Sequence, residues 1–304
     1  MMRESTGPQE EVATATYDPL DLHMQRVGMS RRSTWSKVSS QATLLLLTGI
    51  ALGPQGLSVL TPEILEVLQP GVPVALAVLG VTAAFGHLEE SVFRRRAARL
   101  FSVVILLAGL AMAVRQRTPV EALTTVSQAA CIAILLAGAG WMLSSRGASA
   151  EERRVFSMAT FLLLGGVADY LSISGLLLGW VAATAWRLVR SRALADTRLD
   201  ATYVQHPVTA LLLVTAGAGV QFSWEIALLA LAAVCAAMVT ALVLRRWWAG
   251  RVTFGTSLTP AAFAVAVAMD AAQHDTALVP LLSGIVLAAS ALDVFSSDVG
   301  ESAA

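Results

Sequence analysis

The sequence contains few charged residues. Only 14% of its 304 residues are Asp, Glu, Lys or Arg, against about a quarter in soluble domains. Aromatic residues are also scarce at 6%, whereas 56% of the chain is hydrophobic and its mean hydropathy is +0.68. Charge this sparse, combined with long apolar stretches, argues against a soluble protein and indicates an integral membrane protein. Most of the apolar residues are small, and small residues let membrane helices approach one another closely.

The sequence has only two cysteines, and it lacks the common catalytic motifs. The two cysteines, Cys131 and Cys235, lie far apart in apolar runs, which excludes a disulfide framework, and we expect buried, reduced thiols. The net charge is zero, so bulk electrostatics does not indicate a nucleic acid partner. The sequence has no GxxxxGK[ST], HExxH or GxSxG motif and no Cys/His ligand spacing. We therefore expect neither an enzyme nor a cofactor.

The two ends of the chain differ from its apolar middle. The first 25 residues are polar and partly acidic and contain no apolar core, so they do not form a secretory signal. We expect residues 1–33 to be a disordered cytoplasmic tail. Residues 296–304 form a short acidic tail, which leaves residues 34–295 as the transmembrane domain.

The apolar middle divides into ten segments, most of them near the roughly 20 residues that cross a bilayer. They are residues 35–53, 71–88, 99–114, 120–143, 155–172, 174–189, 207–222, 225–244, 255–272 and 277–295. Only Ser172, Ile173 and Ser174 interrupt the run from 155 to 189. The sequence leaves open whether this run is two helices or one broken helix, and whether 174–189 is a full crossing or re-entrant.

The basic residues indicate the orientation. With ten crossings, nineteen of the 21 Lys and Arg residues fall on one side, and only Arg115 and Arg117 fall on the other. By the positive-inside rule, both termini are then cytoplasmic. A single crossing over 155–189 would place the later basic clusters outside, so the charge pattern favours ten crossings, or eight and a re-entrant pair.

A Gly-Pro pair interrupts the first apolar segment in the stretch TGIALGPQGLSVL, residues 48–60. Gly terminates helices and Pro commonly follows a helix end, so we expect this stretch to end the first helix at the outer surface. The five tryptophans Trp180, Trp186, Trp224, Trp247 and Trp248 also fall near predicted helix ends. Indole rings often anchor helices at the membrane interface.

Several stretches, in order, resemble the monovalent cation:proton antiporters, the sodium/hydrogen exchanger superfamily. ALGPQGLSVL is similar to the family's GxxLGPxGLGxL, and ADYLSISGLLLGWVAATA is similar to its xLGLSxxLGAFxAGxxL stretch. HPVTALLLVTAGAGVQFSWEIALLALAAV resembles the family's next helix pair, and FGTSLTPAAFAVAVAMDAA resembles its discontinuous helix. The resemblance covers roughly residues 40–115 and 155–295.

This resemblance implies an all-α integral membrane protein of about ten transmembrane helices, built as an inverted repeat with discontinuous helices. It implies exchange of Na⁺ or K⁺ for protons by alternating access in a bacterial-type plasma (inner) membrane. The partners would be a monovalent cation, the proton, the lipid bilayer and a second copy in a homodimer, with no nucleic acid.

The sequence departs from the family at its acidic residues. It has no Asp-Asp or Asn-Asp pair, and the second broken-helix motif lacks its Arg at Ala261. These departures favour a transport-inactive subunit or scaffold related to the antiporters. A permease for a small organic solute is a third interpretation.

Five residues are candidates for ion binding: Asp169, Thr124, Thr125, Thr259 and Pro260. Intramembrane carboxylates are costly and usually functional, so Asp169 is the sharpest candidate. The motif allows two alignments for it, one at the ion site and one at the outer interface, and the LSISGLLLGW match favours the interface. The threonines could line a polar path or bond between helices, and Pro260 could mark an unwound or kinked midspan.

We expect Asp270, near the end of the segment 255–272, to lie in an outer loop.

Overall fold

The computed structural model describes most of the apolar middle of the chain. It describes residues 33–85, 92–116, 118–147, 149–189, 192–220, 223–226, 228, 230–232, 235 and 260–289. The chain separates into two units, Met1–Val38 and Ser39–Ala304, and the account below concerns the second. The predicted tails lie outside the described residues, apart from Ser33, at which the first described helix begins.

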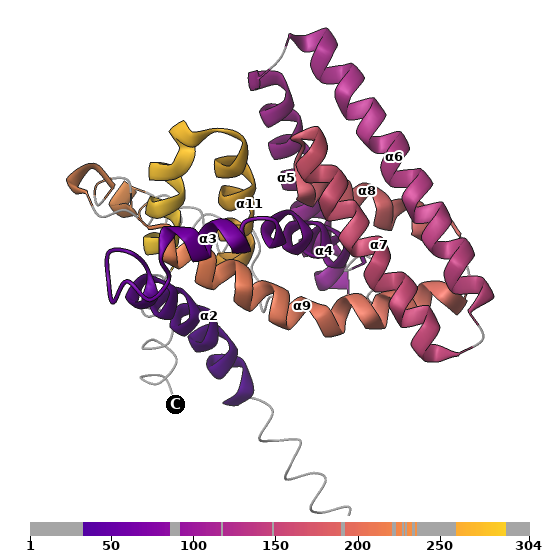
Figure 1. The fold of residues 1–304 in the computed structure, drawn as a ribbon, viewed down its shortest axis with the longest axis horizontal. Helices are drawn as coiled ribbons and strands as arrows, with labels where there is room; N and C mark the ends of the chain where they lie inside the picture. The colour runs from indigo at the N-terminus through magenta and orange to yellow at the C-terminus, as the bar shows by residue number, and fades with distance from the viewer. Residues whose placement is uncertain are drawn as a thin grey trace, which may run out of the picture. The chain divides into compact units, whose positions relative to one another are not determined.

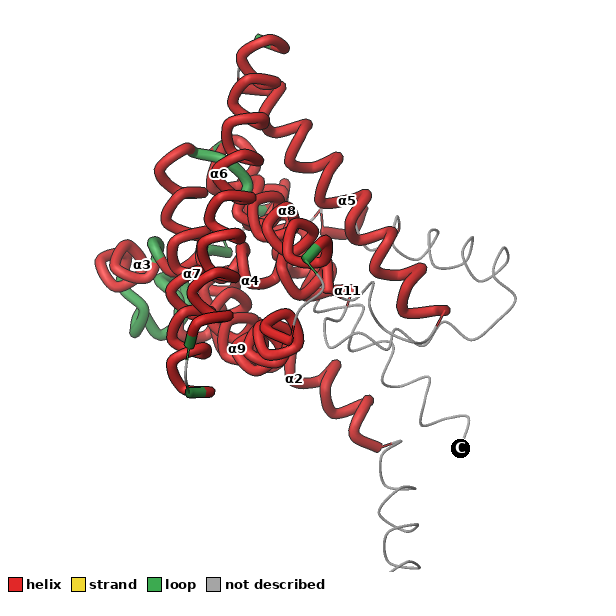
Figure 2. The backbone as a smooth tube through the Cα atoms, turned by 90° about the vertical axis from the view of Figure 1, so that its right-hand side faces the viewer, coloured by secondary structure: helices red, strands yellow, loops and turns green. Residues whose placement is uncertain are grey.

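All regular structure in these described ranges is helical, as Figure 2 shows, which confirms the predicted all-α class. The principal helices, labelled in Figure 1, are α2 (Ser33–Leu52), α3 (Pro62–Leu68), α4 (Gly71–Phe85), α5 (Val92–Gln116), α6 (Pro119–Arg146), α7 (Ala150–Leu171), α8 (Gly175–Leu188), α9 (Arg192–Ala218) and α11 (Pro260–His274). A 3₁₀ turn, η3 (Thr276–Leu278), and a helix Val279–Ala289 follow α11.

Helix α4 lies at the centre of the packing. Nearly all of its side chains are buried, and it packs most extensively against α8 and also against α7 and α9. Two glycines let α4 and α8 approach closely, because a Cβ on Gly80 would meet the Leu176 carbonyl and one on Gly179 would meet that of Ala77. The sequence therefore uses small residues at the helix crossing, as expected where backbones pack closely.

The run from 155 to 189 forms two helices that fold back on one another. The rings of Phe161 on α7 and Trp186 on α8 lie 6.2 Å apart, edge to face. In a continuous helix, 25 residues would separate them by about 37 Å at a rise of 1.5 Å per residue. The chain therefore reverses at residues 172–174, and the sequence's alternative of one broken span is wrong.

The Gly-Pro stretch ends α2, as the sequence predicted. The last helical residue is Leu52, and the following loop satisfies the free carbonyls of the helix. The N–H of Leu57 donates to Ala51 O at 2.7 Å, and that of Leu60 donates to Leu52 O at 2.7 Å. The loop is stable because these bonds replace those that the helix loses at its end.

Two described helices, α6 and α7, are long and apolar enough to cross a membrane. The number becomes three if α3 and α4, which are bent by 45° at a short break, form one span. Helices α4, α8 and α11, with 15, 14 and 15 residues, are shorter than the predicted crossings. The segment 225–244 lies mostly outside the described residues.

Large apolar side chains lie exposed on the described helices. On α5 they include Leu100, Val103, Leu107 and Leu110, and α6 and α7 show a similar set. Water-soluble proteins rarely expose apolar surface over adjoining helices in this way.

Two smaller expectations, the burial of the cysteines and the place of Trp186, differ from this packing. Cys131 and Cys235 are free thiols as expected, but both are exposed, because they lie on outward faces of their helices. Trp186, which we expected to anchor a helix end at the membrane interface, is buried in the helix packing, and its indole N–H donates to the carbonyl of Ala137 on α6 at 2.6 Å. A buried indole N–H needs such a partner.

Candidate functional site

Three helices end near one another and leave polar side chains at their ends. α7 ends before Ser172, whose φ of 49° is left-handed, and α8 begins two residues later with Ser174 as its N-cap. α3 ends at Gln69, and α11 ends at His274. Helix ends leave backbone N–H and C=O groups without partners inside the helix, so polar groups gather where several ends meet.

Asp270 is the buried carboxylate at the centre of this region. Only 1% of its surface is exposed. The hydroxyl of Ser174 donates to one carboxylate oxygen, and the N–H of Gly175 donates to the other at 3.1 Å. Because the first N–H groups of a helix have no partner within the helix and carry partial positive charge, the start of α8 holds this negative group from α11.

Ser174 joins this carboxylate to α8. Its oxygen accepts the N–H of Leu177 at 3.1 Å while its hydroxyl proton goes to Asp270. Ser174 is therefore both the N-cap of α8 and a hydrogen-bond donor to the buried acid, so it links α8 to α11.

His274 lies one turn beyond Asp270 on α11. Its Nδ1 is 2.7 Å from the carbonyl oxygen of Asp270. A carbonyl can only accept, so Nδ1 carries a proton in this contact. The next residue, Asp275, pairs with Arg115 at the end of α5, with 2.7 Å between Nε and Oδ2.

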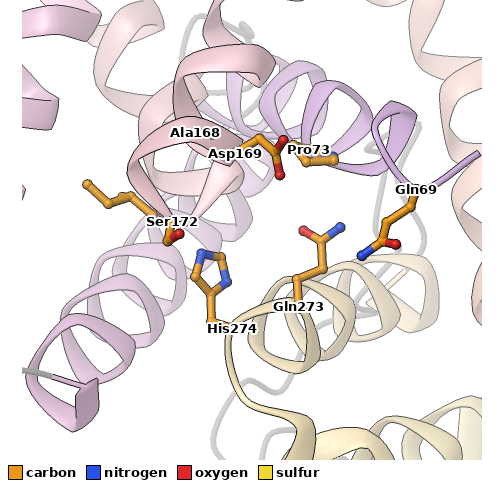
Figure 3. Close-up of a pocket in the computed structure, with 8 residues that line it drawn as sticks. Gln69, Pro73, Ala168, Asp169, Ser172, Gln273 and His274 are labelled. Atoms are coloured by element: carbon orange, nitrogen blue, oxygen red, sulfur yellow. The ribbon is translucent and has the colours of Figure 1, made fainter. Parts of the chain in front are cut away.

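A polar pocket of about 300 Å³ lies beside this acid, between the ends of α3, α7 and α11. It is lined by Gln69, Pro73, Ala168, Asp169, Ser172, Ile173, Gln273 and His274. Figure 3 shows the side chains of Asp169, Gln69, Gln273 and His274 around the same space, with the two amide groups near each other. We call this space the polar pocket.

A second, much smaller cavity of about 10 Å³ adjoins the polar pocket. It shares Ser172, Ile173 and His274 with that pocket and is also lined by Ser174. Its volume is about that of one water-sized probe. Asp169 at the exposed end of α7 lines the first space, and Ser174, which contacts Asp270, lines the second.

The structure brings together two of the five residues that the sequence singled out. Asp169 is exposed in the last turn of α7 and lines the polar pocket. Thr125 lines the small cavity, although its hydroxyl donates to Glu121 O at 2.7 Å within α6.

The other three candidates do not reach these two spaces in the described structure. Thr124 is exposed and bonds within its own helix, to Glu121 O at 2.9 Å. Pro260 is the first residue of α11 and lies at the opposite end of that helix from Asp270. Thr259 lies outside the described residues.

Sequence reasoning missed Asp270 and Ser174. We expected Asp270 in an outer loop, and this is wrong, because α11 continues for four residues beyond it and α8 covers it. The signal that could have found it is the sequence SISGLLLGW, in which a serine precedes an apolar helix and can cap it. Nothing local in the sequence shows which acid, 96 residues away, would meet that cap.

Among the described residues, no group of three or more His, Cys, Asp or Glu side chains could hold a metal ion. Comparisons with known proteins add no assignment, since no family model, no curated protein and no solved structure matches this chain.

Proposed function

We propose that this protein is a membrane secondary transporter that exchanges a monovalent cation for protons by alternating access, with Asp270 as the exchanging acid. The membrane setting is supported by the low charge of the sequence and by the apolar side chains exposed on α5, α6 and α7. Two to three helices have the length and composition of spans.

The observation that carries the proposal is the position of the Asp270 carboxylate. It is buried in a helix whose ten preceding residues are all apolar, and its described hydrogen-bond donors are the Ser174 hydroxyl and the Gly175 N–H. A carboxylate in a low-dielectric site is stable when it binds a proton, a cation or strong hydrogen-bond donors. Competition between a proton and a cation for one such acid couples the two fluxes.

Short helices meeting at a buried charge also support transport. Discontinuous helices place their ends at the ion site of many secondary transporters. Here the N-terminal end of α8 faces Asp270, and both α8 and α11 are too short for a full crossing of about 20 residues. The polar pocket lies at the ends of α3 and α7, and the small cavity is lined by Ser174, whose hydroxyl donates to Asp270.

The proposal also includes the membrane topology and the oligomeric state. We propose about ten crossings in a bacterial-type inner membrane, both termini cytoplasmic, an inverted repeat and a homodimer. Two contacts are consistent with the crossing pattern. Arg115 meets Asp275, both in predicted outer connections, and Arg153 meets Asp196, both in predicted cytoplasmic ones.

The test is proton flux in proteoliposomes that contain the full chain and a pH-sensitive dye. After an imposed pH gradient, we expect Na⁺, K⁺ or Li⁺ to dequench the dye with the native protein. Asp270→Asn should abolish this response, because the amide cannot release a proton. Glu66→Gln is the matched control, because it makes the same chemical change on an exposed side chain of α3.

Each variant is first shown to elute as the native protein on size exclusion in detergent. Unchanged cation-dependent flux in folded Asp270→Asn would overturn the role of this acid. Absence of flux with every cation from folded native protein would overturn transport itself.

A transport-inactive relative is the second candidate, and one observation favours it. Both oxygens of Asp270 accept hydrogen bonds from the start of α8, an arrangement that can simply tie two helices together. The missing Asp-Asp pair points the same way. This candidate predicts no flux but a marked loss of stability in Asp270→Asn.

A further inference from the structure

We infer that the polar pocket binds a small aliphatic primary amine in its ammonium form, with Asp169 as the counter-ion. This inference goes beyond the exchange reaction and does not rest on it, because Asp270 is not among the described residues that line the pocket, whereas the exposed Asp169 at the end of α7 is. The steps below use only the side chains that line the pocket.

The charge of the pocket selects a cation. Asp169 is the only acidic side chain among the lining residues, and no Lys or Arg of the described chain lines the pocket. Within the described structure the Asp169 carboxylate makes no hydrogen bond or ion pair. The nearby Arg115 is engaged by Asp275.

The backbone adds to this preference. The pocket lies at the C-terminal ends of α7 and α11, and also at that of the short α3. The last carbonyl groups of a helix carry partial negative charge, which stabilises a cation placed beside them. These C-terminal ends act in the same sense as the Asp169 carboxylate, while the start of α4, where Pro73 lines the pocket, acts in the opposite sense.

The volume favours an organic cation over a bare inorganic ion. About 300 Å³ is at the lower end of the range for small-molecule pockets, and it equals the liquid volume of about ten waters. A dehydrated Na⁺ or K⁺ would leave most of this space to water. A chain of a few carbons fills it and can lie against Pro73, Ala168 and Ile173.

The lining chemistry narrows the class of amine. A primary ammonium has three N–H donors, and the carboxylate of Asp169 and the amide oxygens of Gln69 and Gln273 offer acceptors around one space (Figure 3). A quaternary ammonium is disfavoured because no Phe, Tyr or Trp of the described chain lines the pocket. An amino acid is disfavoured because the only basic group among the described lining residues is the imidazole of His274, whose Nδ1 already contacts the carbonyl oxygen of Asp270.

The test is calorimetric titration of the full-length protein in detergent with n-butylamine and 1,4-diaminobutane, at constant ionic strength. We expect saturable binding of both, and no measurable binding of tetramethylammonium. Asp169→Asn should weaken binding by about tenfold to a hundredfold, the usual effect of losing a charge-assisted hydrogen bond. Glu66→Gln, which removes a nearby carboxylate outside the pocket, should bind as the native protein does.

Asp169 is exposed, so Asp169→Asn is expected to fold, and its thermal midpoint checks this. Equal binding by folded Asp169→Asn, equal binding of tetramethylammonium, or displacement of butylamine by equimolar NaCl or KCl would each overturn the inference. Absence of any amine binding by the folded native protein would also overturn it. The titration uses no ion gradient, so its failure leaves the exchange proposal intact, and absent proton flux leaves amine binding intact.

Discussion

At the scale of single residues, glycines decide how closely the central helices approach. Gly165 and Gly166 are neighbours on α7 but have opposite surroundings. A Cβ on Gly165 would fall on the backbone of Val74 in α4, at 2.5 Å from its Cα, whereas a Cβ on Gly166 would meet nothing within 4 Å. The two positions separate the effect of packing from the effect of helix propensity.

We expect Gly165→Ala to lower stability by about 1–3 kcal/mol, because α4 and α7 must move apart to admit the methyl group. Gly166→Ala should leave stability unchanged or raise it by up to about 1 kcal/mol, since alanine favours the helix. Thermal unfolding midpoints in one detergent measure both. Equal shifts in the two variants would contradict the close contact of α4 with α7.

At the scale of elements, the helix starts of α7 and α8 show how one capping residue can serve two purposes. Ser149 caps α7 in an exposed capping box with Glu152. Ser174 caps α8 in the core and also donates to Asp270. Each serine accepts the N–H of the residue three positions later, but α7 adds the return bond to the Glu152 side chain and α8 adds the buried acid.

We expect Ser149→Ala to cost about 0.5–2 kcal/mol, the usual loss of an N-cap. Ser174→Ala should cost about 1–3 kcal/mol more, because it also removes one of the two donors to the buried carboxylate and leaves only the Gly175 N–H. The difference between the two thermal midpoints gives the contribution of the Asp270 contact. Matching losses would mean that Asp270 gains nothing from Ser174.

At the scale of the whole described unit, ion pairs join segments that the positive-inside rule predicts to lie on the same side of the membrane. Arg153 and Arg154, at the start of α7, meet Asp196 and Asp200 on α9, with nitrogen–oxygen distances of 3.0 and 3.2 Å. α8 connects α7 to α9 in the chain. Because the start of α7 contacts the first part of α9, the chain must leave along α7 and come back along α8 to the same side of the helix packing.

This return predicts which serines a membrane-impermeant maleimide can reach. In a protein with Cys131 and Cys235 changed to Ser, we expect Ser172→Cys to react in intact cells. Ser149→Cys, at the other end of α7, should react only after permeabilisation. Both positions are exposed in the structure, so a difference reports the side of the membrane. Reaction of both from the same side would contradict a crossing by α7.

Part of the site follows from local sequence and part does not. The break at residues 172–174 and the end of α2 at Gly53 were predictable, because turn and cap residues act on their immediate neighbours. The burial of Asp270 and Trp186 was not, because it depends on helices that are distant in the sequence. An Asp near the end of an apolar segment gives the same sequence pattern whether it lies in an exposed loop or binds the buried start of another helix.

The sequence by itself determined the helical class, the scarcity of charge that indicates a membrane protein, and two of the helix ends, at Gly53 and at residues 172–174. These depend on composition and on short-range backbone chemistry. Only the tertiary structure decided that 155–189 is a hairpin, that Asp169 lines a pocket, and that Asp270 binds the start of α8. Those results depend on which helices pack together, and the many similar small apolar faces of this chain do not encode that choice locally.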